Sequence, residues 1–391
     1  MLKHLRKTAF LALAVMVPAG GQLLGQVPDK DTGMTPNAIG GRIKHFARLG
    51  TSAAEFLTIP TSARGMALGG AYTALGNDLG ALFWNPAGLG DITGPTFQFT
   101  NVNMSEDFSI NYAAGAIPFN DGAGVAAAFL SFFTTEPEEI TTIYQPEGTG
   151  SYFDSYSSVA GGSLAYNISD RFASGVSLKW VHEDIWDITS NAFSLDVGAN
   201  YHTTFMDREI RIGMSIQNLG TNATFKGKKL FTEVDPKELV DTENNTVTVP
   251  RPVRAKRYGS YQTSAFGLPT TLRLGVSYRA YEMENAYLNI SGDFLQPRNL
   301  DVVYAAGAEY HRELGKGYSI DGRFGWHVQS DEETIKDDAG AVLSESPTTR
   351  GLAVGGGFGH DFEEFLLKVD YTMSDKGYLD NWHFLTVTVN F

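Results

Sequence analysis

The feature that most constrains this chain is a long series of segments in which apolar and polar residues alternate. In residues 318–329 the even positions are mostly apolar or aromatic, whereas the odd positions are mostly polar or charged. Successive side chains of a strand point to opposite faces, so a period of two over this length indicates a strand rather than a helix. Fourteen such strands are predicted, at residues 94–102, 107–118, 122–133, 154–167, 171–183, 190–203, 208–218, 268–281, 285–295, 301–312, 317–328, 349–360, 362–373 and 380–391.

The connections between these strands are short and long in turn. The even-numbered connections along the chain are short; the second, at residues 120–122, reads Asn-Asp-Gly, which is typical of a hairpin turn. The long connections, 134–153, 219–267 and 329–348, are all odd-numbered. Outer-membrane barrels have short periplasmic turns and long extracellular loops, so these three are predicted to be extracellular loops. An even strand count also predicts that both termini are periplasmic. The final Phe391 resembles the C-terminal signal of bacterial outer-membrane proteins.

A soluble β-sandwich also shows alternation and is the main alternative. The predicted strands have about ten to fourteen residues, whereas ordinary strands average about five to six, so their length favours a membrane barrel. The predicted fold class is therefore all-β, a transmembrane antiparallel β-barrel of about 14 strands at residues 93–391 in the bacterial outer membrane. Its expected partners are outer-membrane lipid and the barrel assembly machinery.

Residues 1–26 have the layout of a secretory signal peptide. Basic residues such as Lys3 and Arg6 precede an apolar run at 9–17, which is too short to cross a bilayer as a helix, and small residues follow it. The rest of the chain contains no apolar run long enough for a transmembrane helix. Because the chain has no cysteine, disulfide scaffolds and cysteine zinc sites are excluded.

Residues 27–92 are predicted to form an N-terminal arm and a plug within the barrel lumen. Residues 51–92 do not alternate and are rich in Gly and Ala. Asn77 and Asp78 can cap a short helix over residues 79–84, which Asn85-Pro86 then ends, because proline disfavours the helical conformation in the residue before it. A barrel of fourteen strands has a lumen wider than its own side chains fill, so the segment suits a plug. The alternative is a periplasmic arm beneath the barrel.

The amino-acid sequence of this segment is distinctive. Residues 55–57 (Glu-Phe-Leu), 62–75 (Ser-Ala-Arg-Gly-Met-Ala-Leu-Gly-Gly-Ala-Tyr-Thr-Ala-Leu) and 81–89 (Ala-Leu-Phe-Trp-Asn-Pro-Ala-Gly-Leu) resemble the N-terminal signature of the PorV/PorQ family of outer-membrane proteins. These proteins are related in fold to the FadL fatty-acid transporters, whose hatch carries a similar Asn-Pro-Ala-Gly element. The motif residues are Arg64, Gly65, Gly69, Gly70, Asp78, Phe83, Trp84, Asn85, Pro86 and Gly88.

This resemblance implies a FadL-like barrel that acts in type IX protein secretion or surface attachment. Its partners would then be secretion or attachment proteins and their cargo. The alternative function is a FadL-like transporter of hydrophobic small molecules. An apolar pocket around Phe83 and Trp84 would favour transport, whereas an ordered, protruding loop 219–267 would favour a role with protein partners.

Charged residues on the polar face of the strands are expected to point into the lumen. They either bind the plug, set the selectivity of the lumen, or are simply tolerated by a wet interior. These residues are Arg273, Arg279, Asp293, Asp321, Arg323, Lys368 and Asp370.

Loop 219–267 is the longest connection, and it contains an acidic block between two basic blocks. It is either a binding surface for cargo or a partner, or a disordered outer loop. The second basic block is Arg251, Arg254, Lys256 and Arg257.

The sequence carries no recognisable catalytic or cofactor motif. The nucleophile-elbow, P-loop and HExxH patterns are absent, so no catalytic residue, cofactor or metal site is predicted. The net charge of −14 argues against binding of nucleic acid through a basic surface. We therefore predict a non-enzymatic protein.

Overall fold

The computed structural model describes residues 50–105, 107–234, 257–300, 302–329, 334–336, 342–345, 349–376 and 379–391. The predicted signal peptide and the beginning of the predicted arm lie outside these residues. Within the described residues, no helix is both long enough and apolar enough to cross a membrane.

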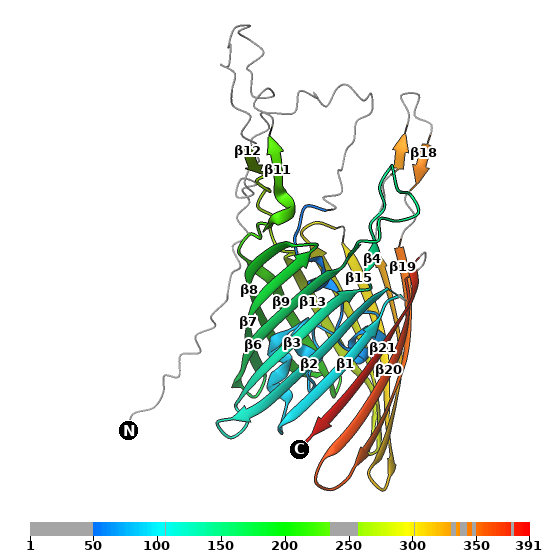
Figure 1. Ribbon diagram of the computed structural model, residues 1–391. Coiled ribbons are helices and arrows are strands. Elements are labelled where there is room, and N and C mark those ends of the chain that lie inside the picture. Colours follow the sequence, from blue (N-terminus) through cyan, green and yellow to red (C-terminus); the bar gives the residue numbers. More distant parts are fainter. Residues whose placement is uncertain are drawn as a thin grey trace, which may run out of the picture. The chain divides into compact units, whose positions relative to one another are not determined.

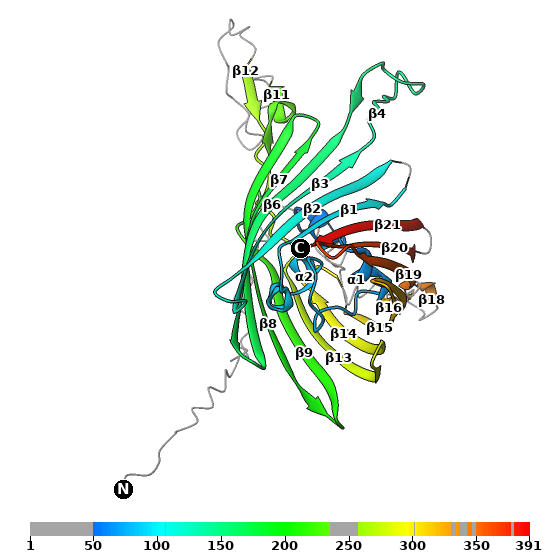
Figure 2. The ribbon, with the colours of Figure 1, turned by 90° about the horizontal axis from the view of Figure 1, so that it is seen from below.

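Within the described part of the chain, fourteen long antiparallel strands form a closed ring (Figures 1 and 2). Each strand pairs with its neighbours in chain order, and β1 pairs with β21 to close the ring. The strands are β1 (Thr96–Asn103), β2 (Phe108–Phe119), β3 (Gly124–Thr135), β6 (Ser155–Ser169), β7 (Phe172–Ile185), β8 (Ile188–Phe205), β9 (Arg208–Gly220), β13 (Thr271–Met283), β14 (Ala286–Pro297), β15 (Val303–Gly315), β16 (Tyr318–Gln329), β19 (Thr349–Asp361), β20 (Leu366–Lys376) and β21 (Leu379–Asn390). The predicted fourteen-stranded barrel is confirmed, and strand ends differ from the prediction by at most four residues.

The alternation in the sequence corresponds to the two faces of the wall. On β16, Phe324 and Trp326 are exposed on the outside, whereas Asp321 and Arg323 are buried inside. The outer face is therefore apolar and the inner face polar, as expected where lipid surrounds a polar lumen.

The three long connections contain short strands that the sequence analysis treated as loop. β4 (Glu138–Glu139) pairs with β5 (Tyr152–Phe153), β11 (Phe231–Val234) pairs with β12 (Arg257–Ser260), and β17 (Thr334–Lys336) pairs with β18 (Val342–Glu345). The middle connection also contains β10 (Lys226–Gly227) and the 3-10 helix η4 (Lys228–Leu230). The connections also begin one or two residues later than predicted, because the preceding strands are longer. Short hairpins of this kind were missed because two to four residues are too few to show alternation.

The two ends of the described chain lie at opposite ends of the barrel. The amide of Phe391 donates to Pro95 O at the end with short turns, and its ring contacts Phe97 and Phe365. Ser52 instead pairs with Gly267, just before β13, at the end with the long connections. The chain before residue 50 lies outside the described residues, so the periplasmic location of both termini stays a prediction.

Residues 50–92, here called the inner segment, lie inside the ring of strands (Figure 2). They form η2 (Glu55–Thr58), α1 (Ala63–Ala67), α2 (Ala81–Trp84) and η3 (Pro86–Asp91). α2 begins two residues later than predicted, because Asp78 Oδ1 accepts from Gly80 N and the turn precedes the helix. Asn85 ends α2, and its side chain accepts from Ala87 N to start η3.

Candidate functional site

Glycines on the inner face of the wall allow the inner segment to approach the wall backbone. A Cβ atom at Gly325 would overlap the backbone of Leu68 and Gly69, and one at Gly213 would overlap Thr73. At Gly325 and Gly213 such overlap cannot be relieved by moving a side chain, because the opposing atoms are backbone. Five other glycines in the described part of the wall would also bring a Cβ atom within 3.0 Å of the inner segment, at backbone or side-chain atoms. We call these residues the wall glycines: Gly175, Gly198, Gly213, Gly275, Gly307, Gly325 and Gly355.

The predicted motif glycines serve the same packing from the other side. Gly69 and Gly70 have positive φ angles, and a Cβ atom at Gly69 would overlap the backbone of Trp326 in the wall. A Cβ atom at Gly65 would overlap the Trp84 ring, and one at Gly88 would come too close to Leu75 O. These glycines therefore allow the inner segment to fold compactly within the barrel.

A buried arginine links the inner segment to the wall. Arg64 donates from Nε and Nη2 to the two carboxylate oxygens of Glu309 on β15, at 2.8 Å each. Its Nη1 lies 2.9 Å from Asp78 Oδ2 and 3.2 Å from Tyr72 Oη, so it also holds the inner segment in its fold. Arg323 Nε donates to the same Glu309 at 2.8 Å, which extends the network along the wall.

Two further contacts, one through a side chain and one through the backbone, hold the inner segment against the wall. Asn85 is fully buried, and its Nδ2 donates to Thr73 O at 2.8 Å and to Ala199 O at 3.2 Å. Asp293 Oδ2 accepts from the amides of Tyr72 at 3.0 Å and Thr73 at 2.8 Å.

The remaining predicted lumen charges fall into three different environments. Arg273 Nε donates to Gln217 Oε1 at 2.7 Å, and its guanidinium lies 4.7 Å from the Trp84 ring centre. Arg279 instead pairs with wall residues, at 3.0 Å from Glu282 Oε1. The other four form one cluster on β16 and β20, in which Arg323 pairs with Asp370 and Asp321, and Lys368 pairs with Asp321.

A β-bulge turns two consecutive side chains of β9 into the lumen. The β8–β9 register shifts between Leu195 and Val197, and Asn218 has a positive φ angle. As a result, both Gln217 and Asn218 are buried on the inside. The sequence analysis missed these residues because a bulge breaks the alternation and leaves no other signal in the sequence.

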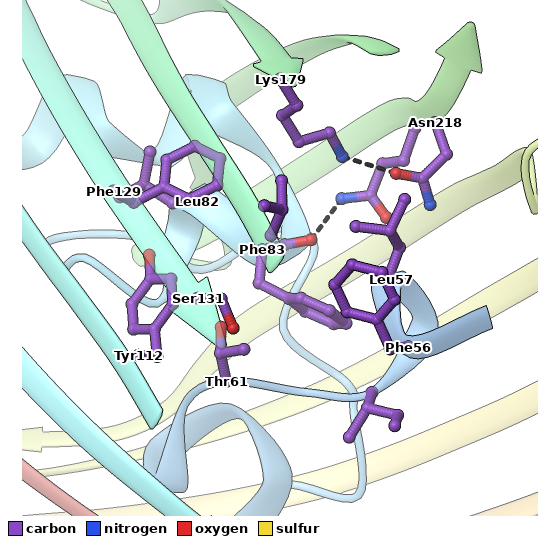
Figure 3. Close-up of a pocket in the computed structure, with 13 residues that line it drawn as sticks. Phe56, Leu57, Thr61, Leu82, Phe83, Tyr112, Phe129, Ser131, Lys179 and Asn218 are labelled. Carbon is purple, nitrogen blue, oxygen red and sulfur yellow. Dashed lines mark hydrogen bonds between the residues drawn. The ribbon is translucent and has the colours of Figure 1, made fainter. Parts of the chain in front are cut away.

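A cavity lies between the η2 turn, α2 and the strands β2, β3, β6, β7 and β9 (Figure 3). Its volume is about 40 Å³. Its lining residues are Phe56, Leu57, Ile59, Thr61, Leu82, Phe83, Tyr112, Phe129, Ser131, Val159, Lys179, Gln217 and Asn218. Most of this lining is apolar, and it includes Phe83 of the predicted motif.

One charged side chain, Lys179, is among the described residues that line the cavity. It is buried, and its Nζ lies 2.8 Å from Asp196 Oδ2 and 2.5 Å from Asn218 Oδ1. Lys179 thus presents a paired charge rather than a free cation.

The η2 turn lines the cavity and is fixed at its N-terminal end by two hydrogen bonds. Ala54 N donates to Glu183 Oε1 at 3.0 Å, and Asn299 Nδ2 donates to Glu55 Oε1 at 2.6 Å. Burial raises the pKa of the Glu55 carboxyl above its ordinary value, the hydrogen bond from Asn299 lowers it, and Glu183 raises it further.

Several predicted features cannot be placed in this site. Arg251, Arg254 and Lys256 lie outside the described residues. Arg257 begins β12, but its side chain is outside the described part of the structure. In the described ranges, no group of three His, Asp or Glu side chains is placed to hold a metal ion.

No protein-family model and no curated protein sequence matches this chain. Among solved structures, the toluene transporter TodX of Pseudomonas putida matches at 11% identity and a TM-score of 0.50, over 84% of this chain and 96% of that chain. A TodX deltaS2S3 mutant, described as a monoaromatic hydrocarbon channel, matches at 11% identity and a TM-score of 0.50, over 84% and 97%. A FadL homologue of Pseudomonas aeruginosa matches at 9% identity and 0.47, over 85% and 98%. The chain thus has the FadL-like fold, a closed antiparallel barrel with an N-terminal segment.

Proposed function

We propose that this protein is a non-enzymatic outer-membrane channel for hydrophobic small molecules. The observation that carries the proposal is the cavity, whose apolar lining includes Phe56, Leu82, Phe83, Phe129 and Val159. Ligand sites are typically concave and mostly apolar with a few polar groups, and this cavity has that composition. The apolar outer face of the wall supports placement in the outer membrane.

The similarity to TodX supports the same proposal. The two TodX structures are named as a toluene transporter and a monoaromatic hydrocarbon channel. Because identity is low, this similarity concerns the fold, and the ligand class must come from the cavity itself.

Filling the cavity is expected to slow uptake. Ser131→Phe places a ring among the lining residues, whereas the matched control Leu130→Phe changes the neighbouring residue on the outer face. Overfilling a packed site costs about 1–3 kcal/mol, so we expect Ser131→Phe to reduce uptake by about tenfold or more. The measurement is uptake of labelled toluene by bacterial cells that express equal amounts of each variant.

Leu130→Phe should keep uptake within about twofold of the unchanged protein, since surface changes alter stability little. Unchanged uptake by the Ser131→Phe variant, with normal barrel assembly, would show that hydrophobic molecules do not pass through this cavity.

A second candidate function is docking of secretion or attachment proteins and their cargo, which the PorV/PorQ resemblance implies. It is favoured by the hairpin of β11 and β12, which projects beyond the ring (Figure 1). Phe231, Tyr258 and Tyr261 on or beside this hairpin are 61%, 71% and 67% exposed. Exposed aromatic residues are typical anchors of protein interfaces.

Removing this hairpin tests the second candidate. Replacing residues 228–261 by a four-residue turn keeps the pairing of Ala223 with Phe266 beneath it and should leave the barrel assembled. If the hairpin docks partners, affinity purification from native outer membranes should then lose them. The control is the double variant Ile143→Ser and Tyr144→Ser, which changes two exposed residues of another long connection. Full recovery of partners by the shortened protein would contradict docking.

A further inference from the structure

Three hydroxyl groups distinguish this cavity from a purely apolar one. They belong to Tyr112 on β2, Ser131 on β3 and Thr61 of the inner segment, and all three residues are buried. Tyr112 and Ser131 face each other across the two strands, and Figure 3 shows all three side chains on one side of the cavity. We call them the hydroxyl cluster.

The hydroxyl cluster is not used by the protein itself. Tyr112 is 3% exposed, and its Oη has no hydrogen-bond partner among the described residues. The Ser131 and Thr61 hydroxyls form no side-chain hydrogen bond within the same described residues, but of the three hydroxyl groups only that of Tyr112 is a fully buried atom without a partner. A buried polar group without a partner carries a desolvation cost, which a bound molecule recovers when it supplies that partner.

The opposite side of the cavity argues against a charged ligand. Lys179 is already paired with Asp196 at 2.8 Å and with Asn218 at 2.5 Å. A carboxylate that entered would meet no unpaired cation on the described lining, and burial of an unpaired charge is strongly unfavourable.

The space available in this state limits the size of the ligand. The cavity volume of about 40 Å³ has room for about three water molecules. A ring-sized compound therefore requires side chains to move. Leu57 and Phe83 are half-buried lining residues, in contrast to the fully packed Leu82 behind them.

We propose that the cavity selects uncharged hydrophobic compounds that carry one oxygen substituent, such as a phenol, alcohol or ketone. The apolar lining accepts the hydrocarbon part, and the hydroxyl cluster pairs with the oxygen. This inference rests on the proposed channel function, because it specifies the ligand class of the same cavity. It goes beyond that function by ranking oxygenated compounds above the bare hydrocarbon and the carboxylate.

Three ligands that share a methyl-substituted benzene ring test the ranking: p-cresol, toluene and p-toluate. Equilibrium binding to the purified full-length protein in detergent should give p-cresol about tenfold higher affinity than toluene, equivalent to about 1.4 kcal/mol. p-Toluate should bind most weakly of the three, because its carboxylate finds no free cation.

Tyr112→Phe removes the hydroxyl oxygen and keeps the ring, so it should preserve folding. In this variant the affinity for p-cresol should fall to that for toluene, while toluene binding stays within about twofold of the unchanged protein, as expected from loss of one hydrogen bond. Ser131→Ala provides a second variant with a smaller effect in the same direction. The control is Tyr304→Phe, which removes a hydroxyl from the exposed outer face.

The outcomes separate this inference from the channel proposal. Equal affinities for toluene and p-cresol, or a preference for p-cresol that survives Tyr112→Phe, would overturn the inference while leaving a hydrocarbon channel intact. Tightest binding of p-toluate would overturn it as well. Binding of none of the three ligands would overturn both proposals.

Discussion

Replacing Arg64 by leucine is expected to detach the inner segment from the wall and open the barrel to polar solutes. Glu309 would lose two hydrogen bonds from Arg64, and Asp78 would lose its ionic partner. Breaking a buried ion pair costs about 3–5 kcal/mol. Such a change shifts the equilibrium between the held and the released inner segment by about two to four orders of magnitude. Single-channel conductance in planar bilayers measures the result.

The matched control for this substitution is Arg279→Leu. Arg279 also lies on the inner face of the wall, but among the described residues it contacts only those of the wall: Glu209, Glu282, Asn289 and the Tyr287 ring. Conductance should therefore stay close to that of the unchanged protein. A closed Arg64→Leu barrel in which residues 51–92 still resist protease would show that Arg64 does not hold the inner segment.

Replacing Gly325 by valine is expected to displace the inner segment by a different route. The new side chain would overlap the backbone of Leu68 and Gly69, which cannot move aside as a flexible side chain could. Overpacking costs about 1–3 kcal/mol for ordinary core sites, and more is expected where backbone opposes backbone. The unfolding temperature of the purified barrel should fall, and its conductance should rise.

Gly322→Val on the same strand is the control, because a Cβ atom there meets nothing within 4 Å. It faces outward, where a branched residue suits both a strand and a lipid-facing surface. If both variants unfold at the same temperature and conduct alike, the close approach at Gly325 has no energetic importance.

The barrel could be predicted from the sequence because its dominant signal is local. Each strand is long enough to show its period by itself, and β16 illustrates this with apolar residues at 320, 324 and 326 opposite charges at 321 and 323. Strand order then followed from the short connections, since sequential strands pair in a meander.

The candidate site could be predicted only in part, because it depends on contacts between distant residues. Arg64 and Glu309 are 245 residues apart, and the sequence analysis named the first but missed the second. Glu309 lies on the same inner face as the other predicted charges, so its position in the alternation could have revealed it. The bulge at Gln217 and Asn218 and the bridge between Ser52 and Gly267 leave no such signal.

The resemblance to the PorV/PorQ family has a physical interpretation in this structure. Arg64, Gly69, Asn85 and Gly88 all take part in folding the inner segment or fitting it against the wall. The motif therefore reports how a segment packs inside a barrel, which both a secretion protein and a transporter require. For this reason it could not distinguish between the two functions.

The wall glycines have a consequence for how fast this protein can work. Along seven strands the inner segment replaces side chains that the wall lacks, so its expulsion would expose wall backbone and require a slow, collective rearrangement. Rotation of Leu57 and Phe83 needs only rotamer changes, which take picoseconds to nanoseconds at exposed positions, whereas collective motions take microseconds to milliseconds. Under the proposed channel function, a passage opened by side chains would therefore let the barrel admit molecules one at a time without losing its seal to water-soluble compounds.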